Sequence, residues 1–459
     1  MKQLVIIGLD CLTPQWALDA WLDDMPNLKA LAGRGVGAPL RSTIPPITVP
    51  AWSAMMTSHD PGMLGVYGFR NRTSHEYDSL KVTNAAAITA RTLWNYLSRN
   101  RLKSLVVGVP QTYPPKPLNG IMVSGFMAPG KDVVFTYPEA IQRVLDQAAG
   151  GDYIIDVKNF RTEDKDALLE SVKQMTAARF RAFRALLRVD EFDFAMVVEM
   201  GPDRLHHGFW RFCDPAHRLY QPGNPYQHVL HDYYIALDDE IGRTVEAAGD
   251  GAAIMVVSDH GAKAMDGAIC INEWLQEQGY LKLKERPAER TRMTPDMIDW
   301  PNTKAWGEGG YYGRLFLNVA GREPQGCIPP GAYESLRDEL KAGLESLGDE
   351  DGKPIGTRAL KPEEVYREVN NIPPDLIVYF GDLDWRSAGS VGVGSVHLRE
   401  NDTGPDDANH QPDGVIAFDP GPDHAVRRAE RYRIYDVAPT VLRFFDIEVP
   451  EDMVGESII

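Results

Sequence analysis

The chain has 459 residues, 43% of them hydrophobic and 25% charged, and its formal net charge at pH 7 is -17. This length and composition are those of a globular protein with a large hydrophobic core. The acidic balance argues against non-specific binding to nucleic acid or to an anionic membrane surface, because both partners are negatively charged. It does not exclude a small anionic ligand, since bound metal ions would dominate the field around them.

The first ten residues, MKQLVIIGLD, contain a short apolar run that ends in an aspartate. The run is too short to span a bilayer and lacks the small-residue cleavage site of a secretory signal, so it predicts a first core strand. The four cysteines form no CxxC pair and are too few for a disulfide scaffold. We therefore expect a reducing, cytoplasmic location.

Apolar runs of strand length recur along the chain and alternate with stretches of helical periodicity. The expected strands are Leu4–Gly8, Ser104–Val109, Ile121–Ser124, Phe194–Val198, Ala253–Val257, Leu376–Phe380 and Val415–Phe418. The expected helices are Met25–Ala32, Arg91–Ser98, Pro138–Ala148, Lys165–Leu187, Gln227–Ala248, Tyr333–Leu347 and Asp436–Phe445. This alternation predicts an α/β fold with a mostly parallel central sheet and helices on both of its faces.

Two stretches fit this pattern poorly. Arg286–Thr303 is polar and rich in Met and Pro, and Asp382–Pro412 is rich in Gly, Asp, Asn and Ser. Long loops of this kind within a compact domain are often functional. We expect a single catalytic domain over residues 1–459, with insertions near 286–312 and 382–412.

Seven scattered residues have side chains that suit divalent metal ions, and four of them come shortly after an apolar run. They are Asp10, Thr48, Asp203, His207, Asp259, His260 and His410. Open α/β sheets bind ligands beyond the carboxyl ends of their parallel strands, so these side chains are expected to meet in one crevice. Carboxylates and imidazoles around a hydroxyl suit two metal ions and the hydrolysis of a phosphate ester.

The first two candidates each have a structural alternative. Asp10 ends the strand LVIIGLD. It is either a metal ligand or a structural residue that caps a helix or forms a turn. The neighbouring Cys11 is expected to be a small packed residue and not a ligand. Thr48 lies before the short helix AWSAMMTS, where Pro50 is accepted in a first turn. It is either an ordinary N-cap threonine or a hydroxyl that a metal ion makes easier to ionise. In the second case it faces the positive end of a helix, which attracts phosphate.

The segment MGPDRLHHGFW follows the strand FAMVVEM. Asp203 and His207 are spaced i, i+4, so a helical turn would place both on one face. His206, at i+3, could also reach that face. The pair is either a ligand pair or a hydrogen bond on a helix surface.

The last candidates lie in AAIMVVSDHG and DDANHQPDG. In the first, a β-branched run ends in Asp259 and His260, which either reach one ion or form a structural turn. In the second, His410 precedes the strand GVIAFDP and is either a solvated loop residue or one more imidazole ligand.

Taken in order and spacing, the motifs resemble a known family over nearly the whole chain. They are the GLD start, PPITVPAW, DRLHH, SDHG, NEWLQEQGYL, NVAGREPQG, PPDLIV, HQPDG and the closing YDVAPTVLRFFDIEVPEDMVGESI. They are similar to those of the type I phosphodiesterase/nucleotide pyrophosphatase branch of the alkaline phosphatase superfamily. The resemblance implies an alkaline-phosphatase-like fold and a metal-dependent hydrolase.

The resemblance also implies a role for each candidate. One ion would be held by Asp10, Thr48, Asp259 and His260, with Thr48 as the nucleophile, and the other by Asp203, His207 and His410. The ions in this family are usually zinc, and manganese suits the same ligands. The implied reaction is hydrolysis of a phosphodiester or phosphoanhydride bond in a small molecule, through a phospho-Thr48 intermediate. Neither a nucleic-acid polymer nor a membrane is expected as a partner, and the sequence does not predict the oligomeric state.

The chain departs from relatives that cleave nucleotides in the stretch after the nucleophile. Those relatives carry HGxxxN, whose Asn contacts a phosphate oxygen, whereas this chain has LGVYGF, with Leu64 and Phe69. Asn71 or a backbone amide could substitute, so nucleotides are the weaker expectation among the diesters. The Cys/Ser-x-Pro-x-Arg signature of formylglycine sulfatases is absent at Thr48–Trp52, which excludes that class.

Other functions stay open. A phosphomonoesterase needs an extra cation, for which Arg70 and Arg72 are candidates, although solvated loop arginines are more common. A phosphodiesterase needs a surface for its second ester group, and the aromatic candidates are Trp52, Tyr67, Phe69, Tyr311 and Tyr312. A non-catalytic phosphoester-binding protein would keep the ligands without turnover. A cofactor-independent phosphomutase normally has a Ser nucleophile and a large inserted domain, and neither is present.

Overall fold

The computed structural model describes residues 2–459. The chain divides into two compact units: unit 1 contains Met1–Leu64, Thr83–Ala262 and His410–Ile459, and unit 2 contains Gly65–Val82 and Lys263–Asn409. Among the described residues, no helix is both long and apolar enough to cross a membrane. The expectation of one catalytic domain with two insertions stays a prediction.

Unit 1 is built on a nine-stranded sheet. Its strands are β1 (Leu4–Leu9), β2 (Val36–Arg41), β5 (Ser104–Val107), β6 (Gly120–Val123), β7 (Thr136–Tyr137), β8 (Phe194–Glu199), β9 (Ala253–Val257), β21 (Asp413–Asp419) and β22 (Tyr432–Arg433). The strand order is β22-β2-β21-β9-β1-β8-β5-β6-β7. From β9 to β6 all neighbours are parallel, whereas β21 is antiparallel to both β9 and β2. This confirms the predicted α/β fold with a mostly parallel central sheet.

The central strands have the sequence of strands that are covered on both faces. Every residue of β1, β8 and β9 is buried, and these strands read as nearly continuous apolar runs. In the register, Leu4 of β1 lies opposite Phe194 of β8 and Ala253 of β9. The three strands therefore end at the same edge of the sheet.

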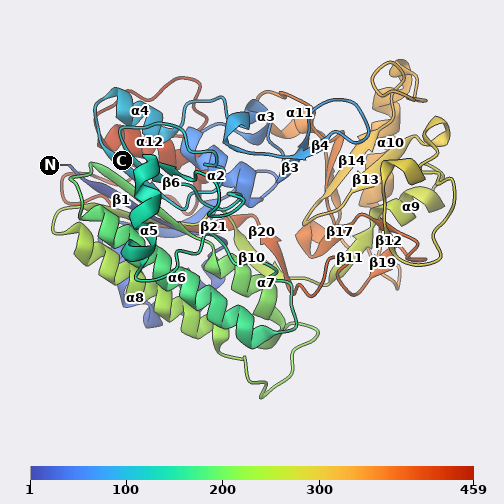
Figure 1. Ribbon diagram of the computed structural model, residues 1–459. Helices are drawn as coiled ribbons and strands as arrows, with labels where there is room; N and C mark the ends of the chain where they lie inside the picture. The colour runs from blue at the N-terminus through green and yellow to red at the C-terminus, as the bar shows by residue number, and fades with distance from the viewer. Residues whose placement is uncertain (1) are drawn as a thin grey trace. The chain divides into compact units, whose positions relative to one another are not determined.

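Helices cover the sheet in two layers. They are α1 (Pro26–Arg34), α2 (Thr48–Thr57), α3 (Pro61–Leu64), α4 (Leu93–Arg99), α5 (Gln142–Ala149), α6 (Lys165–Leu187), α7 (Gly201–Cys213), α8 (Val229–Ala248) and α12 (Val437–Phe444). One layer contains α5, α6, α7 and α8, and α12 packs with α2 and α4 in the other. Figure 1 shows α6 and α8 below the sheet and α4 and α12 above it. All predicted helices of this unit are present within a few residues, and α6 has the predicted bounds, with the Asp164 side chain capping its start.

Unit 2 contains smaller, mainly antiparallel sheets. Its elements are β3 (Arg70–Arg72), β4 (Leu80–Val82), β11 (Gly267–Cys270), α9 (Ile271–Glu277), β12 (Thr291–Arg292), β13 (Ala305–Glu308), β14 (Gly313–Leu317), α10 (Tyr333–Glu345), β15 (Arg358–Leu360), α11 (Pro362–Val365), β16 (Leu376–Tyr379), β17 (Trp385–Ala388), β18 (Ser390–Val391) and β19 (His397–Leu398). The largest sheet has the order β13-β14-β16-β15, and all of its pairs are antiparallel.

Two expectations from the sequence are corrected here. The predicted strand Leu376–Phe380 is β16, so it belongs to the antiparallel sheet of unit 2 and not to the parallel sheet, because an apolar run does not specify its pairing partner. Asp382–Pro412 is not a plain loop, since it contains β17, β18, β19 and β20 (Ala408–Gln411). β20 and β10 (Gly261–Ala264) lie where the chain passes from one unit to the other.

Candidate metal and phosphoester site

All seven candidate residues belong to unit 1 and lie at one edge of its sheet. Asp10 directly follows β1, Asp259 comes two residues after β9, and Asp203 is the third residue of α7, which begins shortly after β8. His410 comes shortly before β21, whose first residues lie at the same edge because β21 runs antiparallel to β9. Each of the seven side chains is buried, with no residue more than 3% exposed.

The first group of side chains surrounds Nε2 of His260. The Thr48 Oγ1 atom lies 3.3 Å from this nitrogen. Asp259 Oδ2 lies 3.2 Å from it, and Asp10 Oδ1 lies 3.9 Å from it. These are the four residues that the family resemblance assigns to one ion.

The second group surrounds Oδ1 of Asp203. His207 Nε2 lies 3.3 Å from this oxygen and His410 Nε2 lies 3.7 Å from it. The His410 ring stacks on the His260 ring at 3.9 Å between centroids, so the two groups are adjacent. Asp203, His260 and His410 offer ligand atoms close enough for one ion, and so do Asp10, Asp259 and His260.

In both Asp10 and Asp259, one carboxylate oxygen accepts a hydrogen bond from a residue that the structure describes, and the other does not. Asp10 Oδ2 accepts a hydrogen bond from Trp52 Nε1 at 2.6 Å, and Asp259 Oδ1 accepts one from the Cys11 amide at 3.2 Å. Asp10 Oδ1 and Asp259 Oδ2 are buried and have no hydrogen-bond partner among residues 2–459. A buried carboxylate oxygen is costly to leave unpaired, so these two oxygens fit the ligands of a cation.

The backbone at Cys11 explains one of these contacts. Its φ is 67°, in the left-handed region that non-glycine residues seldom adopt. The amide of Cys11 is hydrogen-bonded to Asp259, while its Sγ lies 3.4 Å from the Gly261 carbonyl oxygen. Cys11 therefore packs and orients a carboxylate, as expected for a residue that is not itself a ligand.

Two histidines have their tautomer fixed by a backbone carbonyl. His410 Nδ1 lies 2.8 Å from the Pro46 oxygen and His260 Nδ1 lies 3.1 Å from the Gly261 oxygen. Because a carbonyl only accepts, Nδ1 donates in both rings and Nε2 keeps its lone pair. Metal-binding histidines commonly have this arrangement, so the nitrogen donors also fit a cation.

The buried site shifts the pKa of its groups in a consistent way. Burial and the neighbouring Asp203 raise the pKa of Asp10 well above its usual value, and burial with Asp10 does the same for Asp259. Burial also opposes ionisation of Asp203, but its contacts with His207 and Arg204 outweigh burial and hold the pKa of Asp203 well below its usual value. Burial lowers the pKa of His260 to about 4. The imidazole is therefore neutral at neutral pH, as a ligand must be, whereas the carboxylates require added positive charge to ionise together.

Thr48 is the first residue of α2, and Ile47 occupies the cap position, without a side-chain cap. The interpretation of Thr48 as an ordinary N-cap threonine is therefore wrong. Its hydroxyl lies at the positive end of α2, beside His260. This position suits a nucleophile that attacks a phosphate group.

His206 faces a different environment from His207. Its Nε2 lies 2.9 Å from the Tyr234 hydroxyl, and its ring packs against Trp16 and Trp210. Burial lowers the pKa of His206 to about 3. The helical register therefore directs His207, and not His206, towards Asp203.

Several residues that were candidates for contacting the substrate are buried or paired with other residues. Trp52, Tyr67 and Tyr312 are buried and offer no exposed surface for an ester group. Arg72 is buried in an ion pair with Glu323 within unit 2. Trp52 was one candidate among several, because an aromatic residue in a helix has the same sequence pattern whether it faces a ligand or the core.

Asn71 is engaged in its own turn. Its Oδ1 accepts from the Tyr67 amide at 2.7 Å and its Nδ2 donates to the Gly68 carbonyl at 3.0 Å. These bonds occupy the amide that was proposed to replace the missing phosphate-binding Asn. Phe69 and Tyr311 are partly exposed and lie in unit 2.

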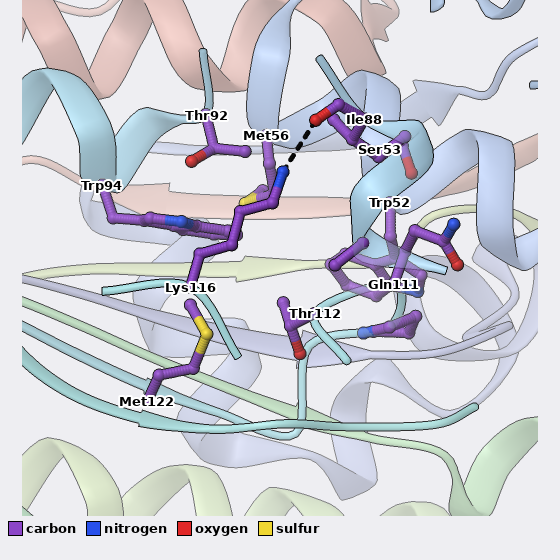
Figure 2. A pocket seen from close by; sticks show the side chains of 12 residues that line it. Trp52, Ser53, Met56, Ile88, Thr92, Trp94, Gln111, Thr112, Lys116 and Met122 are labelled. Carbon is purple, nitrogen blue, oxygen red and sulfur yellow. Dashed lines mark hydrogen bonds between the residues drawn. The ribbon is translucent and has the colours of Figure 1, made fainter. Parts of the chain in front are cut away.

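A small cavity of about 30 Å³ lies beside α2 and contains none of the seven candidates. Its walls include Trp52, Met56 and Trp94, and Figure 2 shows Lys116 reaching from it to the Ile88 carbonyl. Its volume accommodates one or two water molecules, far less than a phosphodiester. The cavity is therefore separate from the candidate site.

Known proteins match both the sequence and the fold. A model of the type I phosphodiesterase/nucleotide pyrophosphatase family matches residues 4–406. Phosphonoacetate hydrolase from Sinorhizobium meliloti, in complex with phosphonoacetate, has a TM-score of 0.62 and 16% identity, covering 97% of this chain and 94% of its own. Human ectonucleotide pyrophosphatase/phosphodiesterase 5 has a TM-score of 0.58 and 12% identity, covering 99% and 97%. No curated protein matches the sequence.

The fold is therefore alkaline-phosphatase-like, and the buried carboxylates and imidazoles form groups that could hold a metal ion. The chain belongs to the type I phosphodiesterase/nucleotide pyrophosphatase family. It is a metal-dependent hydrolase of phosphoesters, which confirms the enzyme class predicted from the sequence motifs.

Proposed function

We propose that the chain hydrolyses small phosphodiesters in two steps, with Thr48 as the nucleophile. Asp10, Thr48, Asp259 and His260 would hold one divalent cation, and Asp203, His207 and His410 the other. The observation that carries the proposal is the position of the Thr48 hydroxyl, 3.3 Å from His260 Nε2 at a helix N-terminus. Zinc suits the donor set of carboxylates and imidazoles, and manganese is the second choice.

When bound, the two cations would supply Lewis-acid charge that favours ionisation of the Thr48 hydroxyl and stabilises the leaving oxygen. Thr48 Oγ1 then forms a bond to phosphorus while the ester oxygen departs with its electron pair and gains a proton. Water cleaves the resulting phosphodiester of Thr48, which still carries the second ester group, and restores the Thr48 hydroxyl. The products are an alcohol and a phosphomonoester. The chain contributes mainly position, because Thr48 and the ligands are held in place by buried contacts.

The charges of the site favour a diester over a monoester. Asp10, Asp203 and Asp259 bring three negative charges, so two divalent cations would leave the cluster with a single positive charge while Thr48 is still protonated. Arg204 contacts Asp203, but it is already paired with Asp156. A diester monoanion matches this surplus, whereas a monoester dianion exceeds it.

Nucleotides are one group of candidate diesters. The murine ectonucleotide pyrophosphatase/phosphodiesterase 5 structure, an inactive form in complex with AMP, has a TM-score of 0.53 and 10% identity, covering 98% of this chain and 96% of its own. Asn71 is engaged in a local turn, which makes nucleotides the weaker choice for this chain.

The test is a comparison of p-nitrophenyl phosphate, bis-p-nitrophenyl phosphate and thymidine 5′-p-nitrophenyl phosphate under identical metal loading. We expect the highest kcat/KM for the simple diester. A clear preference for the monoester would contradict the diesterase proposal. A preference for the nucleotide ester would support the diesterase and correct the ranking of nucleotides.

A further inference from the structure

Arg204 has no role in the proposed reaction, although it lies next to the candidate ligand Asp203 in the DRLHH motif. It is on α7 and is only 4% exposed. Its Nη1 atom donates a hydrogen bond to Asp203 Oδ2 at 2.5 Å. The other Asp203 oxygen, Oδ1, is the one that lies near His207 and His410.

The opposite side of the guanidinium is fixed by a second carboxylate. Arg204 Nε donates to Asp156 Oδ1 at 3.0 Å, and Nη2 donates to Asp156 Oδ2 at 2.8 Å. Asp156 comes from the segment between α5 and α6, far from α7 in the sequence. This two-bond geometry sets the plane of the guanidinium as well as its position.

Two aromatic rings pack near the same guanidinium. Its Cζ atom lies 4.9 Å from the centre of the Phe126 ring and 4.7 Å from that of the Phe160 ring. Phe160 also packs near His207, with 5.8 Å between ring centres. Arg204 is thus held by the Asp156 carboxylate and by two aromatic rings. Its Nη1 atom, which contacts Asp203, therefore has a fixed position.

We infer that Arg204 is a positioning residue that holds Asp203 by Oδ2 and so directs Oδ1 towards the ion shared with His207 and His410. This inference rests on the proposed function, because it concerns one of the two proposed ions. Outer contacts of this kind orient metal ligands, and their loss typically lowers metal affinity about 10- to 100-fold. Lysine could not replace Arg204 fully, because a single ammonium cannot make the same planar set of bonds to two carboxylates.

A purely structural role makes a different prediction. If Arg204 served only to attach the Asp156 segment to α7, its loss would lower the stability of the fold. It would not weaken the binding of one ion more than that of the other. If it positions Asp203, its loss weakens the Asp203 ion and leaves the ion of Asp10 and Asp259 close to normal. Excess metal would then restore much of the activity, which a structural defect would not allow.

The test measures zinc and manganese binding to wild type, Arg204→Gln, Arg204→Lys and Asp156→Asn by competition with a chromophoric chelator. Arg211→Gln is the matched control, because Arg211 is also on α7 but makes an exposed ion pair with Glu163. Thermal unfolding of the metal-free proteins and kcat and KM at rising metal concentration are measured in parallel. We expect Arg204→Gln to bind one of two ions about 10- to 100-fold more weakly, with activity recovering at high metal. Arg204→Lys and Asp156→Asn are expected to lose less metal affinity than Arg204→Gln, and Arg211→Gln is expected to have the metal affinity of wild type.

Equal affinity of Arg204→Gln and wild type for both ions would overturn the inference. So would an equal loss of both ions that follows the loss of thermal stability. If Arg204→Gln does not fold, the affinities of Arg204→Lys and Asp156→Asn for the two ions test the inference by the same criteria. Failure of wild type to bind two ions would instead contradict the proposed function, so the two failures are distinguishable.

Discussion

The contact between Trp52 and Asp10 gives a quantitative prediction for the Trp52→Phe variant. The indole Nε1 donates to Asp10 Oδ2 at 2.6 Å, and both residues are fully buried. The indole lies close against Gly8, where an added Cβ would be 2.6 Å from the Trp52 ring. The glycine of the GLD motif therefore lets the Trp52 ring approach β1 and reach the aspartate that follows it.

Phenylalanine fills most of the ring volume but cannot donate this hydrogen bond. A hydrogen bond to a charged group contributes about 1.5–3 kcal/mol. If this energy orients Asp10 towards its ion, metal affinity falls by about 10- to 100-fold, since each 1.4 kcal/mol is about tenfold. We expect Trp52→Phe to bind one ion that much more weakly, and to recover activity when metal is added in excess.

The assay is a zinc titration against a chromophoric chelator near neutral pH, with turnover of bis-p-nitrophenyl phosphate measured at each metal concentration. Trp94→Phe is the control, because Trp94 is buried in the wall of the same small cavity as Trp52 (Figure 2), whereas the hydrogen bond to Asp10 comes from Trp52. Trp94→Phe is expected to keep the metal affinity of wild type. Wild-type affinity in Trp52→Phe would refute the role given to the Trp52 contact.

Three further predictions follow from the site. Chelation is expected to abolish hydrolysis, and zinc or manganese to restore it; full activity in protein without divalent metal would contradict the metal requirement. His207→Ala is expected to lose one ion and most activity, whereas His206→Ala keeps both ions; the reverse result would mean that the register of α7 is wrong. In the metal-free protein, the pKa of about 3 at His206 lies below its unfolded value of 6.5. Stability is then complete above pH 6.5 and falls towards pH 3, by up to about 1.4 kcal/mol per pH unit for this group. Chemical unfolding between pH 7 and pH 4 measures this slope, and an unchanged slope in His206→Gln would contradict the assignment.

Much of the local structure could be predicted from the sequence, and the structure brings the candidate residues together, for physical reasons. The runs LVIIGL, FAMVVE and AIMVV are apolar on both faces, which is typical of buried parallel strands. The i, i+4 spacing of Asp203 and His207 becomes a shared helical face in α7, and the ends of β1 and β9 bring Asp10 and Asp259 together.

Pairing and side-chain surroundings could not be predicted in the same way. The run at 376–380 has the pattern of a parallel core strand but pairs with antiparallel neighbours, because pairing depends on distant residues. Trp52 was one candidate for a substrate surface, whereas its indole donates a hydrogen bond to Asp10, and Arg204 contacts Asp156, which is 48 residues away. Zinc as the resident ion and a cytoplasmic location stay predictions.

The most direct test of the central proposal is to trap the phosphorylated enzyme. Wild-type protein and Thr48→Ala are mixed with bis-p-nitrophenyl phosphate, quenched in acid within one turnover and digested for mass spectrometry. Thr57→Ala is the control on the same helix, because the Thr57 hydroxyl donates to the Ser53 carbonyl within α2. We predict a p-nitrophenyl phosphoryl group on Thr48 in wild type and in Thr57→Ala, together with loss of both this adduct and turnover in Thr48→Ala. Near-normal turnover in Thr48→Ala would contradict the covalent mechanism.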